Sequence, residues 1–171
     1  MTSSQRLKRR SPKADTQRIP IHFGNDVFID KPVSDVFGYV ADFQNVPKWN
    51  DFVRTVEKET NGPVGVGTRY HQVRNHDQQR FIVTEFEPPR RIAIATVPQS
   101  TPAFSMALRI EPKGDGTILF GSWEFRAVRH RLLARLVGRR MAREAAMNLY
   151  RLKRLLENTA APLQDCRTVR R

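Results

Sequence analysis

The sequence predicts an α+β domain in which a seven-stranded antiparallel sheet wraps around one long C-terminal helix, with two short helices after the first strand. Segments of alternating apolar and polar residues, joined by short turns, recur between residues 19 and 128. Such alternation is typical of antiparallel strands with one wet face. From about Arg129 to Asn158 the chain lacks proline and is rich in helix formers. The first pattern predicts the sheet, and the second predicts the helix.

The 171 residues suit one domain with flanking tails. Residues 1–18 and 159–171 are polar, basic and without periodicity, so we expect disordered tails around a domain at 19–158. The single cysteine, Cys166, excludes a disulfide framework and a cysteine-based zinc site. No apolar run approaches the roughly 20 residues of a membrane span, and no apolar stretch follows the basic start as in a secretory signal. We therefore expect a cytoplasmic protein.

The first strand and the two short helices follow from residues 18–49. The segment IPIHFGNDVFID alternates as a strand does. Pro32 fits a first helical turn. Four apolar residues then follow at the spacing of one face of a helix: Val33, Val36, Phe37 and Val40. Asp42 can cap a second short helix, which we expect to end around Pro47 and Trp49 because proline forbids a long helix there.

Six further strands are predicted from alternation and turn signals: FVRTVEKE, TRYHQVRN, RFIVTEFE, IAIATV, AFSMALRIEP and TILFGSWEFRAV. The connections include NGPVGVG, PPRR and KGDG, which are turn sequences. The last two strands alternate most clearly. One face carries Phe104, Met106, Leu108 and Ile110, and another carries Leu119, Gly121, Trp123 and Phe125.

The long helix would extend about 45 Å at roughly 1.5 Å per residue. Its predicted apolar stripe comprises Leu133, Val137, Met141, Ala145, Leu149, Leu152 and Leu156. The middle of the helix carries small residues: Gly138, Ala142, Ala145 and Ala146. These residues indicate either close packing of the helix on the sheet or room for a ligand between them, and the residues alone do not decide between the two.

The order of one strand, two short helices, six strands and a long helix is similar to the helix-grip fold of the START/Bet v 1-like (SRPBCC) superfamily. Within it, the chain resembles the polyketide cyclase/dehydrase-type lipid-binding branch over about residues 20–158. The resemblance rests on these segments in order: IDKPVSDVFGYVADFQNVPKW, GPVGVGTRY, VTEFEPPRRIAI, GTILFGSWEF and the terminal helix.

This resemblance implies that the two short helices form a V beneath one end of the long helix, with Phe43 and Trp49 wedged against it. A structural role is therefore expected for Trp49 rather than ligand contact. The resemblance also implies that Thr68 and Tyr70 face inward, and it favours an apolar cavity over close packing. The predicted cavity lining, with Tyr70 as its polar handle, is Tyr70, Ile94, Phe104, Met106, Leu108, Trp123, Met141 and Ala145.

No catalytic, metal or cofactor motif can be assembled from the sequence. The four histidines form no metal-binding pair, no Ser-His-Asp or Cys-His arrangement emerges, and GVGTRY is a hairpin turn rather than a phosphate loop because a strand follows it. We expect His71 to be solvated. Glu85 is either an interior acid or base or a surface glutamate, and the surface position is favoured. No cofactor and no metal are expected, and the catalytic residues, if any, are unknown.

The net charge of +13 is unevenly distributed. Residues 19–125 carry eleven Lys/Arg and thirteen Asp/Glu, whereas residues 126–158 carry ten Lys/Arg and two Glu. A self-paired helix would carry more glutamates. The imbalance predicts contact with an anionic surface, and the lack of a nucleic-acid-binding motif favours a membrane or nonspecific polyanion over sequence-specific recognition.

Three functional hypotheses follow. The first is a protein that binds an apolar small molecule or lipid between the sheet and the C-terminal helix, for which the resemblance allows a cyclase or dehydrase activity. The second is a non-enzymatic lipid carrier that docks on anionic membranes. The third is a polyanion-binding protein associated with ribosomes or RNA.

Overall fold

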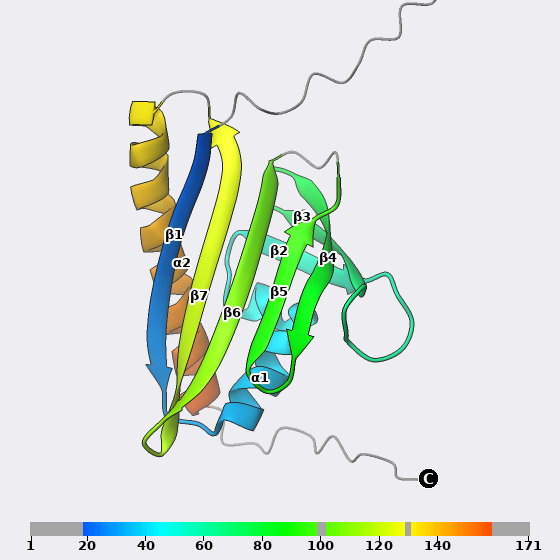
Figure 1. Cartoon of the computed structure of the whole chain (residues 1–171), viewed down its shortest axis with the longest axis vertical. Helices are drawn as coiled ribbons and strands as arrows, with labels where there is room; N and C mark the ends of the chain where they lie inside the picture. Colours follow the sequence, from blue (N-terminus) through cyan, green and yellow to red (C-terminus); the bar gives the residue numbers. More distant parts are fainter. Residues whose placement is uncertain (1–18, 99–101, 129–130, 159–171) are drawn as a thin grey trace, which may run out of the picture.

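A computed structural model describes residues 19–98, 102–128 and 131–158 of the chain. Its seven strands form one antiparallel sheet in the order β1-β7-β6-β5-β4-β3-β2 (Figure 1). The elements in chain order are β1 (Ile19–Ile29), α1 (Val33–Ala41), η1 (Phe43–Lys48), β2 (Val53–Lys58), β3 (Arg69–Arg74), β4 (Gln78–Glu87), β5 (Arg91–Thr96), β6 (Ala103–Lys113), β7 (Gly116–Val128) and α2 (Arg131–Asn158). The predicted fold class and element order are confirmed.

The second short helix, η1, is a 3₁₀ helix that contains Pro47. The Asp42 carboxylate accepts a hydrogen bond of 3.0 Å from the backbone N–H of Gln44, so Asp42 caps the helix as predicted. At the other end, the N–H of Trp49 donates to the carbonyl of Val46. These contacts set the direction in which the chain leaves η1 and enters β2.

The inner, concave face of the sheet carries the two residue sets predicted from alternation. Phe104 pairs with Phe125, Met106 with Trp123, and Leu108 with Gly121. Because directly paired residues point to the same side of a sheet, these side chains form one continuous surface. Tyr70 and Thr68 are both buried, as the resemblance implied.

Strand β4 contains an irregularity that decides the position of Glu85. Val83 is 1% exposed on the inner face, and the register shifts between Val83 and Glu85. A bulge adds a residue to one strand and interrupts alternation. As a result Glu85 pairs with Ala93, and its side chain is 45% exposed and forms an ion pair with Arg91. Glu85 is a surface residue.

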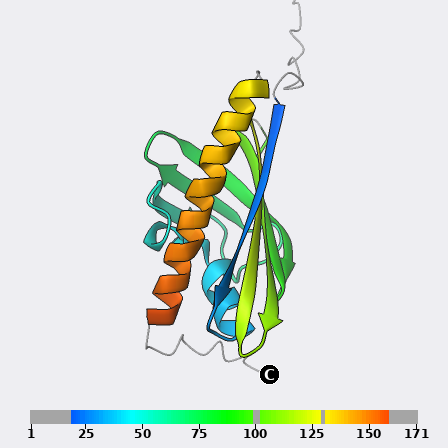
Figure 2. The ribbon, with the colours of Figure 1, turned by 90° about the vertical axis from the view of Figure 1, so that its left-hand side faces the viewer.

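Helix α2 crosses the concave side of the sheet, as seen in Figure 2, and its C-terminal half is the better buried. Leu149, Leu152 and Leu156 belong to the core. Leu133 was predicted in the same stripe, but it is 50% exposed, and Ala134 is buried instead. Each step of four residues advances roughly 40° beyond one helical turn. Over several steps of four, the predicted stripe therefore turns away from the sheet, so that its first residues, near the start of the helix, no longer face the core.

Of the small residues of α2, some pack closely on the sheet and one leaves room for a ligand, so each of the two predicted alternatives holds at part of the helix. A Cβ on Gly138 would lie 2.9 Å from Cγ2 of Ile21, so close packing holds there. The Asn25 side chain donates to the carbonyl of Ala142 at 3.0 Å and ties the helix to β1. Ala146 is exposed. Of these four residues, Ala145 lines the ligand pocket described below.

The predicted tails, together with Cys166, Arg129 and His130, lie outside the described residues. The domain boundaries therefore stay a prediction. Within the described residues, no helix is both long and apolar enough to cross a membrane.

Candidate ligand pocket

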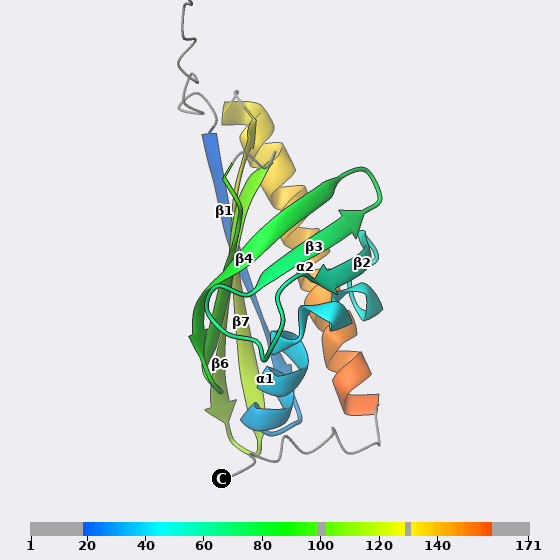
Figure 3. The same cartoon turned by 90° about the vertical axis from the view of Figure 1, so that its right-hand side faces the viewer.

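A pocket of about 320 Å³ lies between the concave face of the sheet, η1 and the middle of α2. Figure 3 shows that β2, β3 and β4 curl toward the helix. Residues of the sheet line the pocket on one side, and residues of α2 line it on the other. The lining residues are Phe23, Phe43, Val46, Trp49, Asn50, Phe52, Val53, Gln72, Arg74, Asn75, His76, Asp77, Ile94, Phe104, Met106, Trp123, Phe125, Met141, Glu144, Ala145 and Asn148.

Four aromatic rings form a continuous row on the wall made by β1, β7 and β6. Phe23 stacks on Trp123 with ring centroids 5.4 Å apart, and on Phe125 at 5.9 Å. Phe125 in turn stacks on Phe104 at 5.6 Å. All four residues line the pocket. The row offers a broad apolar surface of the kind on which another flat ring can stack.

The β3–β4 hairpin changes from apolar to ionic along its length. Tyr70 pairs with Phe81, and Gln72 pairs with Gln79 one step nearer the tip. Nearer still, the Arg74 guanidinium makes two bonds to the Asp77 carboxylate, at 2.6 Å from Nε to Oδ1 and 2.5 Å from Nη2 to Oδ2. Gln72, Arg74 and Asp77 line the pocket, so the pocket becomes more polar toward the hairpin tip.

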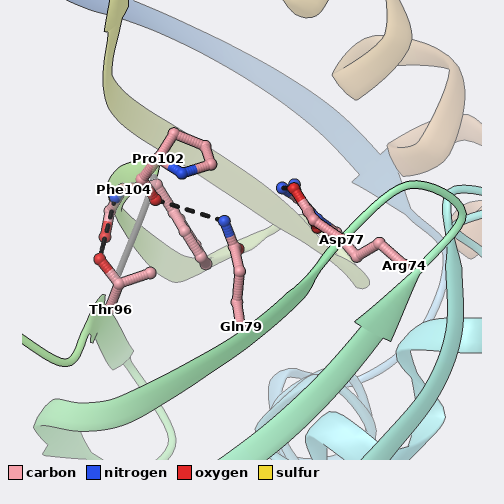
Figure 4. Close-up of polar contacts among 6 residues, drawn as sticks. All are labelled: Arg74, Asp77, Gln79, Thr96, Pro102 and Phe104. Atoms are coloured by element: carbon pink, nitrogen blue, oxygen red, sulfur yellow. Dashed lines mark hydrogen bonds and ion pairs between the residues drawn. The ribbon is translucent and has the colours of Figure 1, made fainter. Parts of the chain in front are cut away.

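Figure 4 shows this tip and the strands beside it. The Gln79 side-chain amide donates to the carbonyl of Pro102 at 3.3 Å, which links the hairpin to the start of β6. The Thr96 hydroxyl accepts from the N–H of Phe104 at 3.1 Å and holds the backbone beneath the aromatic row. These contacts fix the position of the hairpin relative to the apolar wall.

The helix side of the pocket is also partly polar. Asn148 is buried, and its amide oxygen accepts from Arg151 at 3.3 Å. Glu144 forms an ion pair of 2.9 Å with Arg140. Both Asn148 and Glu144 line the pocket opposite the hairpin. A ligand lying between helix and hairpin would meet hydrogen-bonding groups on two sides at this end.

Six of the eight predicted lining residues lie on this pocket: Ile94, Phe104, Met106, Trp123, Met141 and Ala145. The structure places Tyr70 and Leu108 elsewhere, in the packed core, where they are 0% and 1% exposed. Phe43 covers Tyr70 edge-on at 5.3 Å, and Phe81 stacks on it at 5.1 Å. Tyr70 therefore has no surface on the pocket, and it is not the polar handle that we predicted.

The sequence analysis missed several lining residues. Phe125 lies two residues after Trp123 on the same strand and so shares its face, which could have identified it. Phe23 requires the pairing of β1 with β7, because it lies opposite Trp123 in the register. Gln72 shares a face with Tyr70, so its position followed from alternation as well. The loop residues Asn75 and His76 carry no periodic signal.

Trp49 has both the structural position and a place on the pocket. It is 7% exposed and belongs to the core, as predicted, and part of it lines the pocket. Among the described residues, its indole N–H has no hydrogen-bond partner. We predicted a structural role for Trp49 rather than ligand contact, but its position allows both.

Burial raises the pKa of the Tyr70 phenol to about 12, and the nearby Asp42 carboxylate adds to this effect. The unfolded chain would ionise Tyr70 near pH 10, before the folded protein does. The stability that depends on neutral Tyr70 is thus fully present below about pH 10 and is lost as the pH rises toward about 12.

We expect the free energy of unfolding to fall between about pH 9 and about pH 11 more in the parent protein than in Tyr70→Phe, because the variant has no ionisable group there. Denaturant titrations at the two pH values measure the difference. Equal losses in the two proteins would show that the Tyr70 phenol titrates normally.

The described residues contain no group of three or more His, Cys, Asp or Glu side chains placed to hold a metal ion. The His71 side chain is half-buried, on the outer face, and lies 3.2 Å from the Gln78 amide oxygen. The polar groups at the pocket can orient a ligand by hydrogen bonds.

Comparisons with known proteins agree with this fold. A family model described as "Polyketide cyclase / dehydrase and lipid transport" matches residues 20–157. No curated protein matches the chain significantly.

Three solved structures share the fold at low sequence identity. TTHA0849 from Thermus thermophilus has a TM-score of 0.67 and 17% identity, over 82% of this chain and 99% of that one. DR_A0006 from Deinococcus radiodurans has a TM-score of 0.61 and 19% identity, over 80% and 96%. The di-domain ARO/CYC StfQ from the steffimycin biosynthetic pathway has a TM-score of 0.67 and 14% identity, over 82% and 52%.

The predicted helix-grip fold and the SRPBCC resemblance are thereby confirmed. Because the family match extends over nearly the whole described chain, the protein belongs to the polyketide cyclase/dehydrase and lipid transport family.

Proposed function

We propose that the protein binds an amphiphilic small molecule or lipid whose apolar part lies on the aromatic row and whose polar group lies at the β3–β4 hairpin. The observation that carries this proposal is the ordered change from stacked rings, through Gln72, to the Arg74–Asp77 pair along a single pocket. Known ligand sites combine a mainly apolar wall with a few placed polar groups.

The size of the pocket limits the ligand. Ligand pockets commonly measure roughly 300–1,000 Å³, so a volume of about 320 Å³ is at the small end of that range. A compact ring system would fill it and stack on Phe23 or Phe104. A long acyl chain would extend beyond it toward solvent. The pocket therefore favours a flat, fused-ring body over an extended chain.

The family description names cyclases, dehydrases and lipid transport, and one structural neighbour is an ARO/CYC protein of a biosynthetic pathway. Both support a ligand of the polycyclic or lipid class. Cyclase or dehydrase chemistry on that ligand is consistent with the proposal. The buried polar residues that line the pocket, Gln72 and Asn148, would act by orienting the ligand.

Carriage of the ligand without reaction is a second candidate. The observation that favours it is the position of the pocket next to a strongly basic groove on α2, because both are lined by Phe52, Glu144 and Asn148. A carrier needs its opening close to the surface from which it collects its ligand. The polyanion-binding alternative is tested together with that groove below.

Ala145→Leu tests the pocket directly. Ala145 lines the pocket from α2, so a leucine would project into the space that the ligand occupies. We expect the affinity for Nile red, a neutral ring dye, to fall at least tenfold. Leucine and alanine have similar helix propensities, so we expect the unfolding free energy to stay within about 0.5 kcal/mol.

Ala146→Leu is the matched control, since it makes the same change one residue later at an exposed position. It should leave dye binding unchanged. If the parent protein takes up no dye and Ala145→Leu is destabilised by about 1–3 kcal/mol, as overpacking of a filled core predicts, the proposed function is wrong. Native mass spectrometry of the purified parent would then reveal whether any apolar ligand accompanies it.

A further inference from the structure

One side of α2 carries apolar and cationic side chains and faces away from the sheet. At 100° per residue, positions about 3.6 residues apart share a side of the helix. The exposed residues that do so define what we call the arginine face: Leu132, Leu136, Arg139, Arg140, Arg143, Met147, Tyr150 and Arg154. The buried leucines Leu149, Leu152 and Leu156 lie on the opposite side. The arginine face therefore does not pack on the sheet.

Large apolar side chains on this face are strongly exposed. Leu132 is 76% exposed, Leu136 71%, Tyr150 58% and Met147 52%. Single exposed leucines are ordinary on protein surfaces, but here four large apolar groups occupy one side of one helix. That arrangement favours a partner with an apolar interior.

The positive charge on the same face is mostly unpaired. Arg140 has an ion pair with Glu144. Within the described part of the chain, no carboxylate lies within ion-pair distance of Arg139, Arg143 or Arg154. Acidic residues that would neutralise an ordinary solvated helix are missing from this side. The charge is complementary to an anionic surface.

The arginine face adjoins the pocket. A groove between α2 and the loop before β2 is lined by Leu136, Arg139, Arg140, Arg143 and Met147, together with Asp51, Phe52, Glu144, Asn148 and Arg151. Phe52, Glu144 and Asn148 also line the ligand pocket. A surface held against this groove would thus lie next to the pocket.

We propose that the arginine face docks on an anionic lipid bilayer, with the arginines at the headgroups and Leu132, Leu136 and Met147 in the acyl boundary. Helices that lie in a membrane interface combine these two groups on one surface. A nucleic acid would satisfy the arginines, but it would leave the leucines and the methionine exposed, and Tyr150 alone could stack on a base. The apolar residues therefore favour the bilayer.

Sedimentation with vesicles tests the proposal on the full chain. We expect binding to vesicles of phosphatidylcholine mixed with phosphatidylglycerol, and little binding to phosphatidylcholine alone. The double variant Arg139→Glu/Arg143→Glu should bind the anionic vesicles at least tenfold more weakly, because each arginine near such a surface contributes roughly fivefold in affinity.

The matched control is Arg69→Glu/Arg90→Glu, which changes the net charge equally at two exposed positions away from α2. It should retain most of the parent's binding. If the two double variants lose equal affinity, or if the parent does not bind anionic vesicles, the proposal is wrong.

A second pair of measurements separates a bilayer from other polyanions. Leu136→Ser/Met147→Ser keeps every charge, and we expect it to weaken vesicle binding while leaving binding to a single-stranded RNA homopolymer unchanged. In Leu136→Trp, the emission of the new indole should shift to shorter wavelength on anionic vesicles. If the serine variant keeps full vesicle affinity and the parent binds the RNA as tightly as it binds vesicles, the face is a general polyanion surface and the bilayer proposal is wrong.

This proposal and the proposed pocket function fail independently. Leu136, Arg139, Arg143 and Met147 do not line the ligand pocket, so their variants should retain Nile red uptake. Conversely, Ala145→Leu should lose the dye and still bind anionic vesicles.

Discussion

Replacing Trp49 with alanine is expected to lower the free energy of unfolding by about 3–5 kcal/mol, the usual cost of truncating a buried tryptophan. The indole is 7% exposed and belongs to the main hydrophobic core. It lies at the end of η1, where the N–H of Trp49 closes the last turn on Val46. Alanine would leave a cavity between η1 and the sheet, and denaturant titration would measure the loss.

Trp49→Phe separates packing from hydrogen bonding at the same position. Among the described residues, the Trp49 indole N–H has no acceptor, and a buried donor without a partner costs about 1–3 kcal/mol. Phenylalanine removes that donor and keeps most of the apolar volume, so we expect it to be much less harmful than alanine. A fully stable Trp49→Ala that only lost ligand binding would contradict the structural role.

Gly116→Ala is expected to cost about 1–3 kcal/mol, at the upper end of that range because a backbone atom blocks the new side chain. An added Cβ would lie 2.6 Å from Cζ of Phe28 and 2.7 Å from the carbonyl oxygen of Ile29. The Phe28 ring could turn away, but the Ile29 carbonyl accepts a hydrogen bond of 2.9 Å from the Lys31 N–H, and Ile29 is the residue that pairs with Thr117. Relief would require movement of the strands.

We expect Gly116→Ala also to weaken contacts made by the neighbouring residues. The hydroxyl of Thr117, the next residue, donates to the Lys31 carbonyl at 2.6 Å and is fully buried. Gly65→Ala is the control, since nothing lies within 4 Å of its added Cβ. We expect Gly65→Ala to be neutral or slightly stabilising. Thermal unfolding of both variants gives the comparison, and equal stability would show that the paired ends of β1 and β7 are readily deformed.

The fold could be predicted because each element has a local signal. Pro32 and Asp42 flank α1, Asp42 caps η1, Pro47 lies in the last turn of η1, and alternation identifies the inner face of β6 and β7. The bulge after Val83 could not be predicted, because a bulge interrupts the alternation on which the prediction depends. The exposure of Leu133 was also not predicted. Apolar residues chosen at every fourth position rotate gradually around a straight helix and do not stay on one face.

The pocket was predictable where it is made of regular elements and unpredictable where long-range pairing decides it. Ile94, Phe104 and Trp123 face inward by alternation alone. Tyr70 faces inward too, but Phe43 from η1 covers it, and sequence spacing does not reveal which inward residues another element covers. The polar tip of the hairpin depends on the contact between Arg74 and Asp77, which a pass along the chain does not single out.

The unequal attachment of α2 has a consequence for how fast a ligand enters and leaves. Its C-terminal half is fixed by Leu149, Leu152 and Leu156, and by Lys153, whose ammonium donates to the carbonyl of Phe28 at 2.8 Å. Among the described residues of its first half, only Ala134 is buried. Segments with few buried contacts open locally at low free energy. The first half of α2 should therefore exchange its amide hydrogens faster than the second, and its opening would set the residence time of a bound molecule.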